Sequence, residues 1–322
     1  MDVLQAHLAR ARASGGVFAR SVAQPPWGLR LPGTIPLTVH AVIQGRAWLW
    51  LDDPDAALEL APGDVALVRG GPDHYIAHEP GGTCLSPEHF LARHVGDERS
   101  GEHRASVFLC GAYRFSGDIG RGLVDALPPI LPMSAAAADP LHDVIALLSR
   151  ELAASAPGQQ TVLDRLLDVL VVLAIRACFE RSATAPRWYR ASADPRLGPA
   201  LSALHADAAR PWTVSELAAT SGLSRAAFAR SFQQALGQAP IQYLTDWRMT
   251  LARDHLRTGE LTLAQIAART GYASPYAFAA AFRRHHRRPP GQWRQQQLDQ
   301  SDINQAAPDD IHTLRTAPAS GY

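Results

Sequence analysis

The chain contains no lysine: all 31 basic residues among its 322 are arginine. Because the guanidinium group is planar and keeps its charge at physiological pH, every phosphate contact of this protein would come from a permanent, fork-shaped donor. Cysteine is also scarce, and only Cys84, Cys110 and Cys178 occur. This small, odd set excludes a disulfide framework and is typical of a protein that works in a reducing compartment.

Long apolar runs are missing as well. The most apolar stretch, residues 162–178, is interrupted by four charged side chains, and its uncharged segments fall far short of the roughly 18 residues that span a membrane. The N-terminus shows no apolar segment followed by a cleavage site, so we expect no signal peptide. These observations predict a cytoplasmic protein that makes no membrane contact.

Positive charge is in deficit everywhere except in one segment. Residues 1–194 hold 17 arginines against 21 acidic residues, and residues 297–322 hold one against four. Residues 195–296 hold 13 arginines against five acidic residues, which is a net charge of +8. A basic block between acidic ones is expected of a segment that contacts phosphate groups.

The basic block contains one sequence pattern twice. TVSELAATSGLSRAAFARSFQQALGQAPIQYL begins at Thr213, and TLAQIAARTGYASPYAFAAAFRRHHRRPPGQWR begins at Thr262. Corresponding residues are 49 positions apart up to the turn, as Gly222 and Gly271 are, and 50 positions apart after it. This offset predicts a duplicated helix-turn-helix, with units at residues 213–237 and 262–287, in which one turn is a residue longer.

The first unit offers arginine to DNA. Thr213 and Glu216 predict a capping box at its start. A helix-turn-helix reaches base edges with the N-terminal part of its second helix, and only an arginine there makes a bidentate contact to guanine. The predicted base-reading residues are Arg225, Ala226, Ala229 and Arg230.

The second unit offers no arginine at the corresponding positions, where the predicted base-reading residues are Ser274, Pro275, Tyr276 and Ala279. Tyr276 is suited to a thymine methyl group or to a phosphate. Four arginines follow too late in the helix to reach bases, and we assign them to phosphate. They are Arg283, Arg284, Arg287 and Arg288. One unbroken helix between the units would present both recognition helices to successive major grooves.

Residues 197–296 resemble the DNA-binding domain of AraC/XylS-type transcription regulators, through LAATSGLSRAAFARSFQQALGQAPIQYL, IAARTGYASPYAFAAAFRRHHRRPPGQWR and the helix that joins them. The resemblance implies a regulator that binds double-stranded promoter DNA as a homodimer, with RNA polymerase as a candidate partner. The chain departs from the family pattern where Arg287 and Arg288 replace the glycine that the first unit keeps as Gly237. Ala280 also stands where the first unit has Arg230, and both departures favour a backbone-holding role for the second unit.

The N-terminal half has a different pattern. Short apolar runs separated by Gly and Pro turns predict a sandwich or small barrel. LTVHAVIQGRAWLWL and LELAPGDVALVRGGPDHYIAHEPGG resemble the first and second motifs of a cupin barrel, as in the sensor domains of one branch of these regulators. The resemblance implies a small-molecule or oxidant effector, for which the candidate residues are His40, Trp48, His74, Cys84 and Cys110.

The predicted fold class is therefore α+β with several domains. We expect a cupin-like β-barrel that senses the effector (1–135), a helical dimerisation segment (136–181), a linker (182–196), an all-α double helix-turn-helix domain (197–296) and a disordered tail (297–322).

Two other functions stay open at this point. A metal-dependent cupin enzyme with a helical appendage needs two histidines and a carboxylate in the first motif and another histidine in the second. The chain has no His-x-His pair, and only His40 and His74 stand in suggestive places, so we expect no catalytic residue, no metal and no cofactor. A nucleoid-type protein would instead bind DNA without sequence preference. Cys84 and Cys110 are either small buried apolar residues or an oxidant-sensitive pair.

Overall fold

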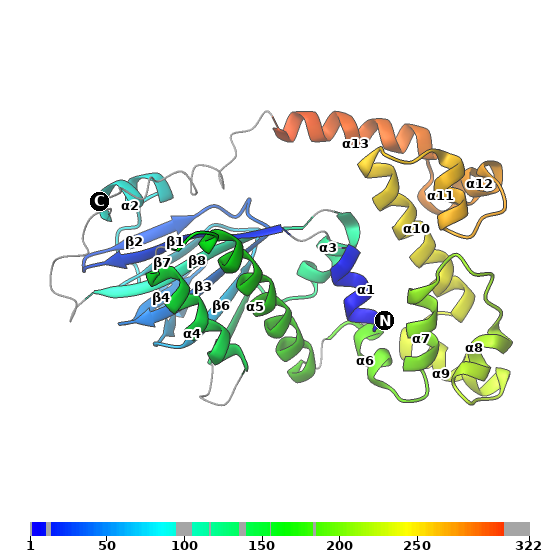
Figure 1. Cartoon of the computed structure of the whole chain (residues 1–322), viewed down its shortest axis with the longest axis horizontal. Helices are drawn as coiled ribbons and strands as arrows, with labels where there is room; N and C mark the ends of the chain where they lie inside the picture. The colour runs from blue at the N-terminus through cyan, green and yellow to red at the C-terminus, as the bar shows by residue number, and fades with distance from the viewer. Residues whose placement is uncertain are drawn as a thin grey trace. The chain divides into compact units, whose positions relative to one another are not determined.

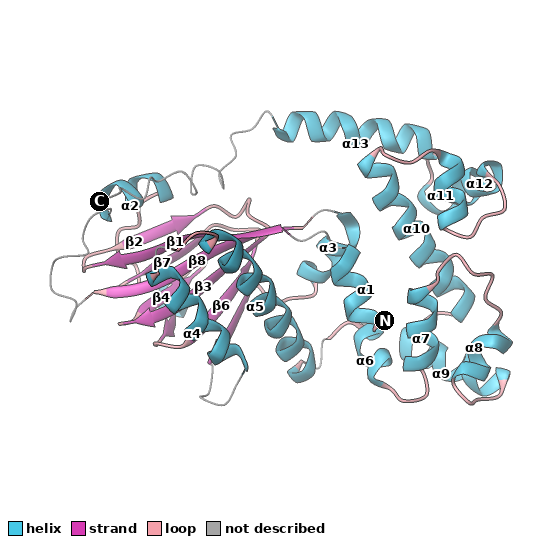
Figure 2. Ribbon diagram, viewed as in Figure 1, coloured by secondary structure: helices cyan, strands magenta, loops and turns pink. Residues whose placement is uncertain are grey.

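The computed structural model describes residues 2–10, 14–94, 105–115, 117–134, 140–154, 156–182 and 185–305. The contacts within the chain divide it into two compact units. The unit made of Ala13–Phe115, Val124–Arg181 and Asp309–Tyr322 is called the β unit here, and the one made of Met1–Arg12, Ser116–Leu123 and Ser182–Pro308 is called the helical unit. Each unit has its own secondary structure (Figures 1 and 2).

The strands of the β unit form two antiparallel sheets. The five-stranded sheet has the order β1-β8-β3-β6-β9 and the four-stranded sheet the order β2-β7-β4-β5. The strands are β1 (Ser14–Ala23), β2 (Gly28–Leu31), β3 (Leu37–Gln44), β4 (Ala47–Trp50), β5 (Leu58–Leu60), β6 (Asp64–Arg69), β7 (His74–Ala77), β8 (Ser106–Arg114) and β9 (Ile130–Ser134). Short helices η1 (Pro54–Ala56) and α2 (Pro87–His94) lie in the connections.

The two sheets share one apolar core. Leu49 and Ile76 of the four-stranded sheet pack in the same cluster as Val42 and Phe108 of the five-stranded sheet. Successive side chains on a strand point to opposite faces, so the residues two positions from these also face the interior. The predicted β-rich N-terminal region is confirmed as a pair of sheets around a common interior.

Helices α4 (Pro140–Ala153) and α5 (Gln159–Arg181) lie across the other face of the five-stranded sheet (Figure 1). The hydroxyl of Tyr113 on β8 donates a hydrogen bond to the Asp168 carboxylate of α5. Both helices also keep apolar side chains in solvent. None of the helices in the described part of the chain combines the length and the hydropathy that a membrane span requires.

The helical unit holds two separate cores along one connecting helix. Its helices are α1 (Val3–Arg10), most of α3 (Gly117–Asp125), α6 (Arg187–Ala193), α7 (Gly198–Ala206), α8 (Val214–Thr220), α9 (Arg225–Leu236), α10 (Pro240–Thr258), α11 (Leu263–Arg269), α12 (Pro275–His286) and α13 (Pro290–Gln305). Leu244 and Trp247 of α10 pack with α7, α8 and α9. Met249 and Leu256 of α10 pack with α11 and α12.

Three segments differ from the expected domain limits. Val3 of α1 packs in the helical unit although the sequence analysis placed it in the sensing domain, because the apolar side of this short helix is covered there. The predicted linker contains α6, whose Trp188 stacks on His7 with ring centroids 4.0 Å apart. Helix α13 continues to Gln305, nine residues into the predicted tail, since this stretch has no Gly or Pro to end it. Residues 306–322 lie outside the described part.

Candidate nucleic-acid interface and sensing cluster

Both helix-turn-helix units begin with the same cap. In the first, Glu216 N–H donates to Thr213 Oγ1 at 3.2 Å, and Thr213 N–H donates to Glu216 Oε2 at 2.8 Å. In the second, Gln265 N–H donates to Thr262 Oγ1 at 3.2 Å, and Thr262 N–H donates to Gln265 Oε1 at 2.9 Å. The predicted capping box is confirmed, and it occurs in both units.

The turns close in the same way but differ in length. Leu223 N–H donates to Ala218 O at 3.0 Å in the first unit, and Tyr272 N–H donates to Ala267 O at 2.8 Å in the second. The glycine of each turn has the left-handed φ that favours this residue, 62° and 76°. Four residues separate the helices of the first unit and five those of the second. The extra residue is Ala273, which lies between the closing tyrosine and the next helix cap.

The first recognition helix, α9, presents the predicted face. Ser224 caps it by accepting a hydrogen bond from Ala227 N–H at 3.2 Å. Phe228 and Phe232 are fully buried and fix the inner side of the helix. Positions three and four residues apart share a helix face, so two of the four predicted base-reading residues, Ala226 and Arg230, lie opposite the phenylalanines, whereas the other two lie toward their side. Of the four, Ala229 is half-buried and the others are exposed, namely Arg225, Ala226 and Arg230.

The second recognition helix, α12, presents mainly an aromatic ring. Ser274 accepts a hydrogen bond from Ala277 N–H at 3.1 Å, so its oxygen caps the helix, and Pro275 occupies the first turn. Both are only partly exposed, as is Ala279. Tyr276 is 87% exposed. Of the four residues predicted to read bases here, Tyr276 therefore reaches farthest into solvent.

The four arginines assigned to phosphate are all exposed. Arg283 and Arg284 lie in the last turn of α12, and Arg288 donates to Gln296 Oε1 at 2.7 Å. Arg287 caps the C-terminus of α12 with φ 61°, the only positive φ of a non-glycine residue in the described chain. Gly237 has the same role after α9, with φ 78°. The arginine thus keeps the left-handed conformation for which the first unit uses glycine.

A second group of predicted residues meets inside the β unit. His40 of β3, His74 of β7 and Cys110 of β8 are buried between the two sheets. His40 Nδ1 lies 3.2 Å from Cys110 Sγ, and His40 Nε2 lies 2.9 Å from His74 Nε2. Thr38 Oγ1 is 3.2 Å from His74 Nε2. These contacts form one hydrogen-bonded chain that links the sheets, and it is named the sensing cluster here.

Comparisons with known proteins match both parts of the chain to described families. Residues 2–180 match a family described as Cupin, and residues 217–296 match a helix-turn-helix domain. The chain is 32% identical over 298 residues to a Streptomyces lividans protein described as an AraC-like transcription regulator, covering 91% of this chain and 98% of that protein. The chain belongs to the AraC-like family of transcription regulators.

Other members of the AraC-like family show the same agreement. The regulator AlkR of Acinetobacter baylyi is 28% identical over 285 residues, which cover 85% of this chain and 92% of AlkR. A crystal structure of a transcriptional regulator from Chromobacterium violaceum, of the type with an AraC-type DNA-binding domain, is 30% identical with a TM-score of 0.31, covering 33% of this chain and 96% of that one. Because the Streptomyces lividans protein and AlkR are described as regulators, the family favours a regulatory function over the cupin-enzyme alternative.

Electrostatics keep the sensing cluster of this AraC-like regulator uncharged. Burial lowers the pKa of His40 well below its ordinary 6.5, and the neighbouring His74 lowers it further. Burial also lowers the pKa of His74 to about 4 and raises the pKa of Cys110 to about 12. In one consistent arrangement of protons, Cys110 S–H donates to His40 Nδ1, His40 Nε2–H donates to His74 Nε2, and the Thr38 hydroxyl donates to Val68 O.

The other two sensing candidates lie elsewhere. Trp48 of β4 alternates with the interior residues Ala47 and Leu49, so it points to the opposite face of its sheet. Cys84 is half-buried, its thiol donates to Gly82 O at 3.3 Å, and burial raises its pKa to about 11. All three cysteines are free thiols. The structure therefore brings together three of the five sensing candidates.

Sequence reasoning missed one member of this cluster although a signal was present. Thr38 lies two residues before His40 on β3, and a period of two places both on the interior face.

In the described residues, no group of three or more His, Cys, Asp or Glu side chains has a metal-binding arrangement.

Proposed function

We propose that this AraC-like regulator reads promoter DNA with α9 and holds the same duplex with α12. The proposal rests on the difference between the exposed side chains at the N-terminal ends of α9 and α12. Arg225 and Arg230 project from α9 with no partner acid in an ion pair of the described chain, and a free guanidinium fork matches the O6 and N7 atoms of guanine. On α12 the corresponding end carries Tyr276, which suits a thymine methyl group or the sugar-phosphate backbone.

Exposed arginines beyond the reading positions supply sequence-independent affinity. Arg283, Arg284, Arg287 and Arg288 extend from the end of α12 in a stretch without acidic residues. Each phosphate contact releases a counterion, so such a cluster strengthens binding to any duplex and makes it depend on salt. A nucleoid-type binder would have this component alone, whereas the proposed regulator adds base reading by α9.

A selection experiment tests this function. The full chain is incubated with a pool of random duplexes at physiological salt, bound DNA is amplified through several rounds, and the enriched sequences are footprinted. We expect two conserved blocks about one helical turn apart, with guanines in the block that α9 contacts. Retention of all sequences alike would support nonspecific binding and contradict the proposal.

Control of DNA binding is assigned to the β unit. The sensing cluster places a thiol, two neutral imidazoles and a hydroxyl between the two sheets, where a small-molecule or oxidant effector changes their hydrogen bonds. An effector shifts DNA affinity only by its differential affinity for the two arrangements of the protein. Replacement of Cys110 by serine should abolish the response of a promoter reporter to hypochlorite or peroxide, while Cys178→Ser should retain it. An unchanged response in Cys110→Ser would contradict the oxidant as the signal.

Apolar side chains exposed on α4 and α5 support a homodimer through this segment. Leu147, Val162 and Val169 are 40%, 41% and 45% exposed, and a second copy of the segment would cover them. Sedimentation of the full chain should give a dimer that Val169→Asp converts to a monomer. Ile241→Asp, at a residue 40% exposed on α10, is the matched control and should leave the mass unchanged.

A further inference from the structure

Among the described residues, no common hydrophobic core joins the two helix-turn-helix units. The cluster around α8 and α9 and the cluster around α11 and α12 share no residue, although both include residues of α10. Leu244, Trp247 and Leu251 belong to the first, and Met249 and Leu256 belong to the second. Each unit packs on α10 through its own core, and direct contacts between the two units add to this packing in setting their relative orientation. Such contacts therefore contribute to the separation of the recognition helices.

Arg248 of α10 makes such a contact. Its Nε donates to Ala208 O at 2.6 Å, and its Nη2 donates to Arg210 O at 2.8 Å and to Ala209 O at 3.3 Å. Three successive carbonyl groups of the loop between α7 and α8 thus converge on one guanidinium. A planar fork with fixed donors holds such a set in one geometry, which a flexible ammonium does not.

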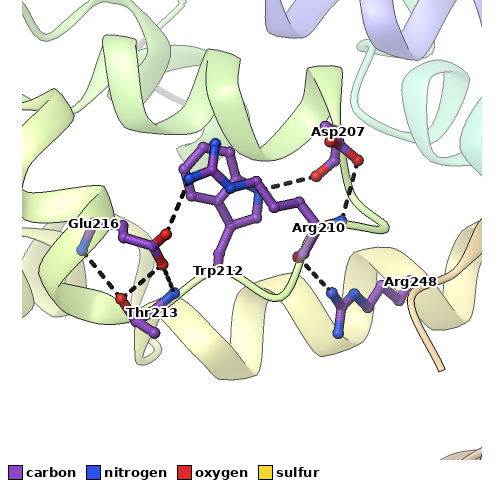
Figure 3. A network of polar contacts seen from close by, with 6 residues as sticks. All are labelled: Asp207, Arg210, Trp212, Thr213, Glu216 and Arg248. Carbon is purple, nitrogen blue, oxygen red and sulfur yellow. Dashed lines mark hydrogen bonds and ion pairs between the residues drawn. The ribbon is translucent and has the colours of Figure 1, made fainter. Parts of the chain in front are cut away.

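The loop that Arg248 holds is itself tied to the first unit (Figure 3). Arg210 donates from its backbone to Asp207 Oδ1 at 3.1 Å and from its side chain to Glu216 Oε1 at 2.9 Å. Its guanidinium lies 4.0 Å over the ring of Trp212, whose Nε1 donates to Asp207 O at 2.9 Å. The loop is therefore coupled to the capping box of α8, and a shift of Arg248 relative to the loop is a shift relative to the first unit.

The second unit touches the same point from the other side. A Cβ atom added to Gly271, the glycine of the second turn, would lie 2.4 Å from Ala209 O and 2.7 Å from Arg248 Nη2. Glycine is the residue that permits this approach, and its φ of 76° also favours it. The loop of the first unit, the connecting helix and the turn of the second unit thus meet at Arg248.

We infer that Arg248 is a positioning residue that fixes the separation of the two recognition helices, and through it the spacing of the two DNA blocks that the regulator accepts. This inference rests on the proposed reading of DNA by both units. We assign Arg248 no contact with bases. It acts by holding the first unit's loop against the second unit's turn.

Binding to DNA of altered spacing tests this role. The duplex selected by the full wild-type chain is remade with one, two or three base pairs inserted between its two blocks, and dissociation constants are measured at one salt concentration. The wild type should lose about tenfold or more in affinity as soon as the blocks are displaced, a loss comparable to that of one or two mismatched base pairs. Arg248→Met should bind the original duplex less tightly and show affinities that vary by about threefold or less over the same series.

Three further variants keep the result interpretable. Arg253→Met removes another guanidinium of α10, one that lies over Trp293 in the core around α11 and α12, and it should keep the wild-type dependence on spacing. Arg248→Lys should fall between the wild type and Arg248→Met. Gly271→Ala disturbs the same junction from the second unit and should also relax or shift the preferred spacing, which provides the readout if Arg248→Met does not fold.

The two proposals fail in different ways. If the wild type selects no sequence, the proposed DNA reading is wrong. If the wild type selects two blocks but Arg248→Met and Gly271→Ala keep its dependence on spacing, DNA reading stands and the role of Arg248 is overturned. An equal loss of affinity at every spacing, with the wild-type ratio preserved, would show that Arg248 only stabilises the fold.

Discussion

The two helix-turn-helix units of this regulator are alike where they face their own cores and different where they face solvent. Both have a threonine cap, the same closing hydrogen bond in the turn and two buried phenylalanines. Their exposed parts have diverged: α9 carries Arg230 where α12 carries Ala280, the charged Glu216 corresponds to the neutral Gln265, and Gly237 corresponds to Arg287. Packing constrains the first set of positions in both copies, whereas the second set is free to serve different tasks.

The largest expected effect concerns base reading by the first unit. Arg230→Ala should cost about 1–3 kcal/mol on the selected duplex and relax the preference at one base pair, because a bidentate contact to guanine is lost. Tyr276→Ala in the second unit should cost less, since it removes an apolar or backbone contact. Binding to the selected duplex and to its single-base variants measures both.

Arg196→Ala is a suitable control for Arg230→Ala, because Arg196 is exposed but precedes both units. It should change neither affinity nor preference. An equal loss on every duplex from Arg230→Ala would refute its role in reading bases.

The next effect is the dependence on salt that the second unit supplies. Replacement of both Arg287 and Arg288 by glutamine should weaken binding to all sequences alike and reduce the slope of log K against log salt by about 2, close to one per phosphate contact. Titrations at several salt concentrations measure the slope. A loss confined to the selected duplex would instead assign these arginines to base reading.

A smaller effect, opposite in sign in the two units, is expected at the helix ends. Arg287→Gly should raise the free energy of unfolding by about 1 kcal/mol, because a side chain in the left-handed region costs about that much relative to glycine. Gly237→Ala should lower it by at least about 1 kcal/mol, because alanine meets the same left-handed backbone and its Cβ would lie 2.1 Å from Arg187 Nη1, which must move. Urea unfolding gives the free energy of unfolding of each variant and of the wild type. Changes of the same sign in the two variants would show that the two caps are not equivalent.

The smallest expected effect is on the pH dependence of stability, in which the two capping boxes should differ. Hydrogen bonds from the Thr213 hydroxyl and backbone N–H, with a further one from Arg210, lower the pKa of Glu216 from its ordinary 4.5 to about 2. A carboxylate with a depressed folded-state pKa stabilises the fold fully above its unfolded pKa, and this contribution is lost as the pH falls through the folded pKa. Gln265 does not titrate, so the loss affects only the first unit.

Thermal unfolding midpoints of the wild type and Glu216→Gln measure this effect between about pH 5 and about pH 2. The midpoint of the wild type should fall more steeply with decreasing pH than that of Glu216→Gln. Gln265→Glu provides the reciprocal variant and should make the fall steeper than in the wild type. Parallel curves for the wild type and Glu216→Gln would contradict the assignment.

The duplicated helix-turn-helix could be predicted from the sequence. A period of 49 positions and a change to 50 located both units and the longer turn, and the structure identifies Ala273 as the inserted residue. The sheets of the N-terminal half and the helices that follow them also agree with the expected pattern. These features depend on the spacing of residue types along the chain, which can be read from the sequence alone.

Contacts between distant segments were not predictable in the same way. No local pattern distinguishes Arg248 from the other arginines of α10, because its three acceptors are backbone carbonyl groups that lie 38 to 40 positions earlier. The convergence of His40, His74 and Cys110 likewise depends on the pairing of β3 with β8 and on the packing of two sheets. Residue types suggested these candidates, and only the three-dimensional structure showed that Trp48 and Cys84 lie apart from them.

Helix α1 has a consequence for the order in which the protein is made. Val3, from the first residues of the chain, and Ile119 share a core with Leu201 and Phe228, which are synthesised much later. A nascent polypeptide on the ribosome exposes the apolar side of α1 until the helices after residue 197 have emerged to cover it. Translation must therefore pass the first helix-turn-helix unit and reach Leu251 of α10 before this core closes, and a transcript cut short between the sheets and α7 yields a product in which α1 is uncovered.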